Sequence, residues 1–424
     1  MSTNNHVLMV SISFPPKNDP ECLQAGKYFS YLKREKWDVS VVTSAIPTLH
    51  MPYDNALEPL AQGSHQLIEI PIVENKYLNF IFRKTRIKNL EQPDSKVAFI
   101  QGKERVINTL KEAPDLIYSR SFPVSSALLA EQLRDHYNVP WVLHLSDPWS
   151  ISPIHHFHGE LKKFHEEAEF RLFEKADLIC LSSRNAIEAY TKHYPQFENK
   201  FHYSPNVYDP ESPRNEVKRT RKTLKISYTG GLAGRRSPVP IIRAFQEIYE
   251  HEPELCKNLK LHFAGPFDRK NRGLLSQSGL PFLVDEGLLS FTKALELQQE
   301  SDLLLLIDTP VDNPESSYFF PSKFLDYLQA KRKIIALTYP NSPVDLVMTE
   351  EHGFKAYYGN EGQLTEIFKK LLHAFKFSES TVFEQNQELP EEYSAKFQSQ
   401  KLSVQFDRLI AQSREKNLQM GKKS

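Results

Sequence analysis

Short apolar runs alternate along most of the chain with longer segments that have helical periodicity. The runs are continuous and rich in β-branched residues, which is typical of strands covered on both faces. In the N-terminal half, strands are predicted at His6–Ser13, Val39–Thr43, Asp115–Tyr118, Trp141–Leu145 and Asp177–Leu181. Helices are predicted between them at Cys22–Lys36, Ser125–His136 and Gly159–Lys175. This succession predicts an α/β fold with a parallel sheet.

The segment Asn206–Thr223 interrupts the pattern, because it is rich in charge and proline and has little to bury. It is predicted to link two domains. Beyond it, further strands are predicted at Lys225–Thr229, Lys260–Ala264, Leu303–Ile307 and Ile334–Leu337. Helices are predicted at Pro240–Glu250, Thr292–Glu300, Ser322–Ala330 and, with no strand after it, Ser394–Lys416.

A chain of 424 residues suits two domains of this kind. We predict two doubly wound, Rossmann-like domains, residues 1–205 and 206–393, and a C-terminal helix, residues 394–424, that crosses back to the first domain. Ligands of open α/β sheets bind outside the carboxyl ends of the strands. Two such edges facing each other would form a cleft suited to two substrates and to the exclusion of water.

Composition narrows the class of protein. Lys+Arg and Asp+Glu both number 53, so no net charge attracts nucleic acid or an anionic membrane. Cys22, Cys180 and Cys256 stand far apart without a C-x-x-C motif, which argues against a disulfide framework or a zinc site. The apolar run near the N-terminus is expected to be a short buried strand and not a signal peptide, and the sequence has no stretch of about 18 apolar residues. We expect a cytoplasmic protein without a bound metal.

A glycine turn follows the first predicted strand of the second domain. Gly230, Gly231 and Gly234 allow the backbone to approach a ligand, and the helix that follows offers unpaired N–H groups. Arg235 and Arg236 add positive charge. The combination predicts a diphosphate site. The alternative is an ordinary strand–helix turn with exposed arginines.

The helix predicted at Ser322–Ala330 carries a second pair of candidates. Ser322 is predicted to cap it, and Lys323 and Asp326 lie on one side of its first turns because they are three residues apart. Lys323 is placed to meet a phosphate, and Asp326 to accept hydrogen bonds from ribose hydroxyls. The alternative is a solvated ion pair.

The segment Pro140–Trp149 provides candidates in the first domain. A predicted strand ends at His144, and Asp147 stands in a proline-stiffened turn beside Trp149. At the carboxyl edge of a sheet, His and Asp are candidates for catalysis or sugar binding. The alternative is an aspartate that caps the turn and a histidine satisfied within the core.

Two further segments are weaker candidates. In the first strand–helix loop, Lys17, Asn18 and Glu21 are expected to line the cleft, unless the prolines of this loop make it a rigid surface element. In Lys76–Lys88, aromatic and aliphatic residues interleave with cations, as in helices that lie on anionic lipid. The alternative for this segment is a helix packed on its own domain with a basic outer face.

In their order, these segments resemble family 4 of the retaining glycosyltransferases, which have the GT-B fold and a subfamily 4-like N-terminal domain. The matching motifs include HVLMVSISFPP, VPWVLHLSDPW, ISYTGGLAGRRSP and FPSKFLDYL, and they span nearly the whole chain. The resemblance implies a UDP- or GDP-linked sugar donor bound mainly to the second domain and an acceptor toward the first. Gly231, Arg235 and Arg236 match the diphosphate loop of the family, and Asp326 matches its ribose-binding acidic residue. Retention without a metal or other cofactor is implied.

The sequence departs from the family pattern at three places. The family often pairs two glutamates eight positions apart, where this chain has Tyr318 and Asp326. The glycine pair of the first loop is replaced by Asn18-Asp19. The adjacent His-Asp pair of the first domain is represented by His144 and Asp147, which are not adjacent.

The expected function is transfer of a hexosyl group from a nucleotide-sugar to a glycan or lipid-linked glycan in polysaccharide biosynthesis, with contact to the inner face of the membrane as a possible setting. Asp147 or His144 would face the transferred sugar or the acceptor hydroxyl. Two alternatives stay open. One is a nucleotide-sugar 2-epimerase, and the other is a non-catalytic nucleotide-binding or scaffold protein, suggested by Tyr318.

Overall fold

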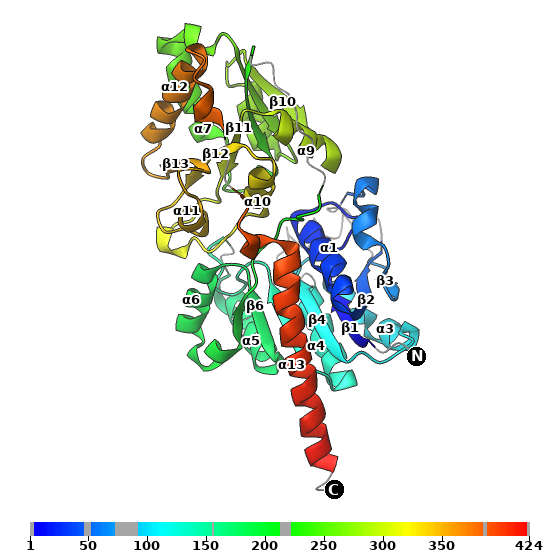
Figure 1. Ribbon diagram of the computed structural model, residues 1–424. Helices are drawn as coiled ribbons and strands as arrows, with labels where there is room; N and C mark the ends of the chain where they lie inside the picture. Colours follow the sequence, from blue (N-terminus) through cyan, green and yellow to red (C-terminus); the bar gives the residue numbers. More distant parts are fainter. Residues whose placement is uncertain are drawn as a thin grey trace. The chain divides into compact units, whose positions relative to one another are not determined.

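The computed structural model describes residues 4–45, 52–72, 92–154, 157–212, 222–384 and 388–421. The chain divides into two compact units, one of Met1–Pro210 with Glu391–Ser424 and one of Glu211–Pro390 (Figure 1). Each unit has one sheet whose described strand pairs all run parallel. The predicted α/β class, with two successive doubly wound sheets, is confirmed.

The first unit has a seven-stranded sheet in the order β3-β2-β1-β4-β5-β6-β7. Its strands are β1 (Asn5–Val10), β2 (Trp37–Ser44), β3 (Leu67–Ile70), β4 (Leu116–Ser121), β5 (Trp141–Leu145), β6 (Leu178–Leu181) and β7 (Phe201–Tyr203). Its helices are α1 (Pro20–Leu32), α3 (Lys103–Thr109), α4 (Ser125–Tyr137), α5 (Gly159–Lys175), α6 (Arg184–His193) and α13 (Ala395–Gly421). The strand order reverses between β1 and β4, the position where ligands of such sheets bind.

The second unit repeats the plan with six strands in the order β10-β9-β8-β11-β12-β13. Its strands are β8 (Leu224–Thr229), β9 (Leu259–Ala264), β10 (Leu283–Gly287), β11 (Leu303–Ile307), β12 (Lys333–Thr338) and β13 (Gly353–Tyr357). Its helices are α7 (Val239–His251), α8 (Arg269–Ser276), α9 (Phe291–Glu300), α10 (Ser322–Gln329), α11 (Pro343–Val347) and α12 (Gly362–Lys376). Here the reversal lies between β8 and β11.

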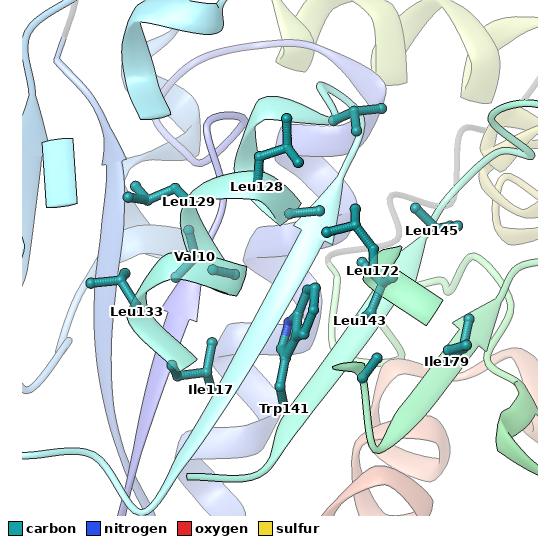
Figure 2. Close-up of a cluster of buried hydrophobic side chains, with 14 of the residues drawn as sticks. Val10, Ile117, Leu128, Leu129, Leu133, Trp141, Leu143, Leu145, Leu172 and Ile179 are labelled. Carbon is teal, nitrogen blue, oxygen red and sulfur yellow. The ribbon is translucent and has the colours of Figure 1, made fainter. Parts of the chain in front are cut away.

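Both faces of the first sheet are buried, which explains its continuous apolar runs. On β1, Leu8 and Val10 join one hydrophobic cluster, while Val7 and Met9 join the cluster on the opposite face. Figure 2 shows part of the first cluster, to which α4 contributes Leu128, Leu129 and Leu133 and β5 contributes Trp141 and Leu143. Successive side chains of a strand point to opposite faces, so a strand covered on both sides must be apolar throughout.

The C-terminal helix α13 packs on the first unit, where it lies beside α1 (Figure 1). Phe406 of α13 meets Trp37 with ring centroids 5.4 Å apart, and the Trp37 indole N–H donates to the Ser403 hydroxyl at 2.8 Å. The division between the units, at Pro210–Glu211, falls inside the predicted linker 206–223. Near the start of that segment, Val207 is fully buried in the first unit, and its carbonyl oxygen accepts from the Lys27 amine at 3.1 Å. Residues 213–221 of that segment lie outside the described residues.

The sequence pattern did not predict four of the described strands. These are β3, β7, β10 and β13, which are the edge strands of the two sheets. Each of these strands has exposed or partly buried positions, so an unbroken apolar run is neither needed nor present. Edge strands are covered by fewer neighbours and tolerate polar residues. Among the described helices, none is both long and apolar enough to cross a membrane.

Candidate functional site

The turn after β8 lies in backbone contact with the turn after β9. Gly230 has a φ of 132°, in the range that favours glycine, and its amide donates to the Ala264 carbonyl oxygen at 2.8 Å. Gly265 has a φ of 146° and packs so closely that a Cβ there would overlap the Gly230 carbonyl. The Tyr228 hydroxyl donates to the Gly231 carbonyl oxygen at 2.7 Å. Only residues without side chains allow the two turns to meet in this way.

Lys323, the second residue of α10, reaches this glycine turn. Its Nζ donates to the Tyr228 hydroxyl at 2.9 Å and lies 4.4 Å from the centroid of that ring. A Cβ on Gly230 would overlap this amine and lie 3.0 Å from Lys323 Cε. Glycine at position 230 therefore allows the amine to rest on the turn.

Arg236 brings a second cation to the same place. Its Nη2 donates to the Thr309 hydroxyl at 2.5 Å, and its buried Nε has no hydrogen-bond partner among the described residues. Burial, and then the charge of Arg236, lower the pKa of Lys323 well below its usual value. In the described part of the chain, no carboxylate lies within ion-pair distance of Lys323 or Arg236. Two basic side chains thus meet at one phenol, and the carboxylates of Asp308 and Asp326 act on Lys323 only from beyond ion-pair distance. Such an arrangement is suited to an anion.

Arg235 is held differently from its neighbour. Its guanidinium forms a two-pronged ion pair with Asp312, with N–O distances of 2.8 and 2.9 Å, and it is exposed. The hydrogen bond that Arg235 donates to Asp312 raises the pKa of Arg235. The structure therefore brings Gly230, Arg236 and Lys323 together and leaves Arg235 with a carboxylate of its own.

Asp326 follows Lys323 by one turn on α10 and is partly buried. The negative charge of Asp326 raises the pKa of Lys323 and so opposes the effect of burial. The amine of Lys323 nevertheless bonds to Tyr228, so the alternative of a solvated helical ion pair does not describe it. The predicted cap by Ser322 is wrong. Ser322 is already the first residue of the helix, and Pro321 occupies the cap position without a side-chain bond.

Three residues of this site were not predicted from the sequence: Tyr228, Thr309 and Asp308. Tyr228 supplies the hydroxyl that Lys323 binds, and Thr309 supplies the acceptor for Arg236. Asp308, at the carboxyl end of β11, is fully buried and accepts from the Thr338 hydroxyl at 2.9 Å. Burial raises the pKa of Asp308. They could have been found from their positions, because Tyr228 lies near the end of β8 and Asp308 and Thr309 follow β11 directly. Polar groups at these strand ends face the site.

In the first unit, a buried ion pair lies at the carboxyl edge of the sheet. Arg120, near the end of β4, is only 1% exposed, and its Nε donates to Glu21 Oε1 of α1 at 2.7 Å. Its Nη2 donates to Glu21 Oε2 and to the Ser146 hydroxyl, both at 3.3 Å. The guanidinium lies 4.9 Å from the Tyr28 ring centroid. The sequence motifs pointed to Glu21 and did not reveal Arg120.

His144 belongs to this network. It lies within β5 opposite Arg120 of β4, and it is buried. Its Nδ1 is 2.9 Å from Arg120 Nη1 and 2.9 Å from the Tyr118 hydroxyl. Because a guanidinium can only donate, Nδ1 must accept and the ring proton belongs on Nε2. Burial and the nearby Arg120 hold the pKa of His144 well below its usual value. The ring therefore faces a buried network, and its catalytic role stays a prediction.

Asp147 stands in the turn Ser146–Ser150 that follows β5, where it is partly buried. The turn is fastened on both sides. The Ser146 carbonyl oxygen accepts from the Ser182 hydroxyl at 2.5 Å, and the Trp149 amide donates to the Tyr190 hydroxyl at 2.8 Å. Asp147 is thus placed at the carboxyl edge of the sheet on a turn with fixed ends.

The first strand–helix loop is anchored from within. Lys17 is 1% exposed, and its Nζ donates to the Thr43 hydroxyl at 2.9 Å and to the Ser44 carbonyl oxygen at 2.7 Å. Burial lowers the pKa of Lys17 to about 8. The expectation that Lys17 lines a cleft is therefore wrong, because its amine is used to fix the loop. Asn18 donates to Asp54 at 3.2 Å.

The basic segment Lys76–Lys88 lies outside the described residues. Among the residues that are described, no group of three or more His, Cys, Asp or Glu side chains is arranged to hold a metal ion.

The architecture matches solved structures along nearly its whole length. Sucrose-phosphate synthase from Thermosynechococcus elongatus superposes with a TM-score of 0.61 at 14% identity, over 99% of this chain and 100% of that chain. WaaG, a glycosyltransferase involved in lipopolysaccharide biosynthesis, gives a TM-score of 0.61 at 14% identity, over 94% and 98%. Anabaena HepE in complex with UDP and glucose gives 0.59 at 13%, over 97% and 99%.

The chain has the GT-B fold. No protein-family model matches the sequence, and no curated protein is significantly similar to it. At 13–14% identity, the likeness to the solved structures concerns the fold alone.

Proposed function

We propose that this protein is a glycosyltransferase that transfers a hexosyl group from a nucleotide-sugar, bound by its second unit, to a glycan or lipid-linked glycan. The observation that carries the proposal is the pair Lys323 and Arg236, two basic side chains that form no ion pair with any described carboxylate and lie beside a glycine turn at the carboxyl end of β8. Anionic groups bind where backbone N–H groups, glycines and cations converge. The complex of HepE with UDP and glucose supports the same assignment.

The two cations supply the electrostatic part of the chemistry. As the bond from the anomeric carbon to the diphosphate breaks, negative charge grows on the leaving oxygen. Lys323 and Arg236 stabilise this charge, because they are fixed in place and largely shielded from water before the reaction begins. Gly230 leaves room for the Lys323 amine to rest on the turn, where it can meet the phosphates. Asp326 binds the ribose hydroxyls. We propose that no metal or other cofactor takes part.

The acceptor is assigned to the first unit, where Asp147 stands on a fastened turn at the carboxyl edge. Asp147 would orient the acceptor hydroxyl or the transferred sugar. His144, with Arg120 on its Nδ1, positions the neighbouring polar network. Retention of configuration and membership of glycosyltransferase family 4 are part of the proposal. They follow from the resemblance of the motifs.

The test combines binding with product analysis on the purified protein. Calorimetry with UDP and GDP is expected to show binding of at least one nucleotide. A panel of nucleotide-sugars is then expected to include one that the protein hydrolyses slowly to sugar and nucleotide. No binding at millimolar nucleotide would favour the non-catalytic alternative suggested by Tyr318. Release of an epimerised sugar would favour the epimerase.

Gly230→Ala is expected to weaken nucleotide binding, because the new Cβ occupies the position of the Lys323 amine and displaces it. The φ of 132° also costs about 1–3 kcal/mol of unfolding free energy for a residue with a Cβ. Gly234→Ala is the matched control. It strains a backbone with a φ of 61°, but nothing lies within 4 Å of its Cβ. Calorimetry and urea denaturation measure both effects. Equal nucleotide affinity in the two variants would contradict the placement of Lys323.

A further inference from the structure

A buried carboxylate holds the turn that carries Asp147. Glu169 of α5 is fully buried, and its Oε1 accepts from the Ser150 amide at 3.0 Å and from the Tyr190 hydroxyl at 2.5 Å. Its Oε2 accepts from the Ser150 hydroxyl. Three donors therefore converge on one carboxylate, two of them from the last residue of the turn.

The same hydroxyl that binds Glu169 also reaches the turn. The Trp149 amide donates to Tyr190 Oη at 2.8 Å, so α6 is joined to the turn and to α5 at one atom. The Trp149 indole N–H donates to His165 Nδ1 of α5 at 3.0 Å, and His165 stacks on Phe157 with ring centroids 3.7 Å apart. The residues after Asp147 are thus anchored at Trp149 and at Ser150.

We infer that Glu169 is a positioning residue that holds the turn Ser146–Ser150, and with it Asp147, in the geometry needed for sugar transfer. This inference rests on the proposed function. An ionised carboxylate only accepts hydrogen bonds, so it dictates the orientation of all three donors. A fully buried carboxylate is costly to maintain, and here its hydrogen bonds go to the turn and to the tyrosine that also binds the turn. Small displacements of reacting groups are sufficient to slow catalysis strongly.

The charge state of Glu169 makes its role measurable. Burial raises the pKa of Glu169 to about 6, and the hydrogen bonds from Ser150 and Tyr190 oppose this rise. The titratable groups that face it are Tyr190 and Tyr194, from α6 and the residue that ends it, with His165 on α5 near the same turn. Protonation places a donor on one carboxyl oxygen, so the hydroxyl of Ser150 or Tyr190 that donates to this oxygen must reverse its hydrogen bond or lose it.

Activity and stability respond to this proton in opposite directions. The folded-state pKa of about 6 lies above the ordinary value of 4.5, so the folded protein binds the proton more tightly than the unfolded chain does. Acidification from about pH 6 to 4.5 therefore adds to the stability contributed by this group. If protonation of Glu169 lowers activity between about pH 6 and 4.5, unfolding caused by this group is not the reason, because the same proton stabilises the fold.

The first test measures donor turnover and UDP affinity in Glu169→Gln. Turnover is expected to fall about tenfold, with UDP affinity unchanged within about twofold, since UDP binds the second unit. The wild type should lose turnover below about pH 6, and this acidic limb should be absent in the variant. Glu131→Gln is the control, a buried carboxylate on α4 that binds Arg171 at 2.8 Å instead of the turn. Equal turnover in the two variants, or an unchanged acidic limb, would overturn the inference.

The second test does not depend on activity. The fluorescence of Trp149, taken as the difference between the wild type and Trp149→Phe, is expected to titrate near pH 6 and to lose this titration in Glu169→Gln. If Glu169→Gln does not fold, Tyr190→Phe removes the shared hydroxyl with little change in volume and should shift the titration midpoint. A titration that both substitutions leave unchanged overturns the inference. Absence of any donor turnover in the wild type counts against the proposed function alone.

Discussion

Arg236→Ala is expected to lower the affinity for UDP about 10- to 100-fold, whereas Arg235→Ala leaves it within about threefold. A hydrogen bond between charged groups contributes about 1.5–3 kcal/mol, and each 1.4 kcal/mol is a factor of ten in affinity. Arg236 has an unpaired Nε and no carboxylate partner in the described part of the chain. Arg235 is already bound by Asp312 at 2.8 Å and has little to gain from a phosphate. Calorimetry on both variants measures the difference.

Lys323→Met should produce a loss of affinity similar to that of Arg236→Ala, but without a loss of stability. Burial disfavours the charged amine, and the charge of Arg236 disfavours it further. Removing either cation therefore relieves the repulsion between the two in the absence of nucleotide. We expect the melting temperature of Lys323→Met to be unchanged or higher, which is the behaviour of a site built for binding at the expense of stability. Equal losses of UDP affinity in Arg235→Ala and Arg236→Ala would show that the diphosphate lies elsewhere.

Arg120→Met is expected to lower the free energy of unfolding of the first unit by about 3–5 kcal/mol. The substitution leaves Glu21 partly buried with its main counter-charge removed, and an unpaired buried charge carries the full cost of its desolvation. Urea denaturation, followed by circular dichroism, measures the change. Lys192→Ala removes an ion pair with Glu188 in which both side chains are at least 69% exposed, and it should change stability by less than about 0.5 kcal/mol.

The double variant Arg120→Met with Glu21→Gln separates the charge from the packing. If the cost of Arg120→Met arises from the unpaired carboxylate, the second substitution should restore a large part of the lost stability, because it removes the charge that needs a partner. Additive losses would instead indicate that Arg120 stabilises the unit through its contacts with Tyr28 and Tyr118.

The central strands were predictable because nearly every residue in them is apolar and buried. Leu303–Ile307 and Trp141–Leu145 were predicted with the observed limits, since five consecutive apolar or buried residues identify a strand covered on both faces. The edge strands β7 and β10 were not predictable in this way, because their exposure varies with the neighbours that the fold gives them. The pattern of apolar residues therefore identifies a strand only where both faces of that strand are covered.

The candidate site shows the same division. The glycine turn at 230–234 was visible in the sequence, because glycines between a strand and a helix indicate close backbone approach. Arg235 and Arg236 are identical in type and adjacent, so no local argument separates them. The partner of Arg235 is Asp312, which is 77 positions away, and that contact decides which arginine remains for an anion.

By itself, the sequence determined the α/β class, the central strands of both sheets and the position of the glycine turn, because each depends on residues that are near one another in the chain. The tertiary structure decided which charges are paired. It joined Arg120 to Glu21 across 99 positions, hydrogen-bonded His144 to the same arginine and placed the Lys323 amine against Tyr228. The physical reason is that the free energy of a charged side chain is set by its desolvation and by its counter-ion, and both come from segments distant in sequence.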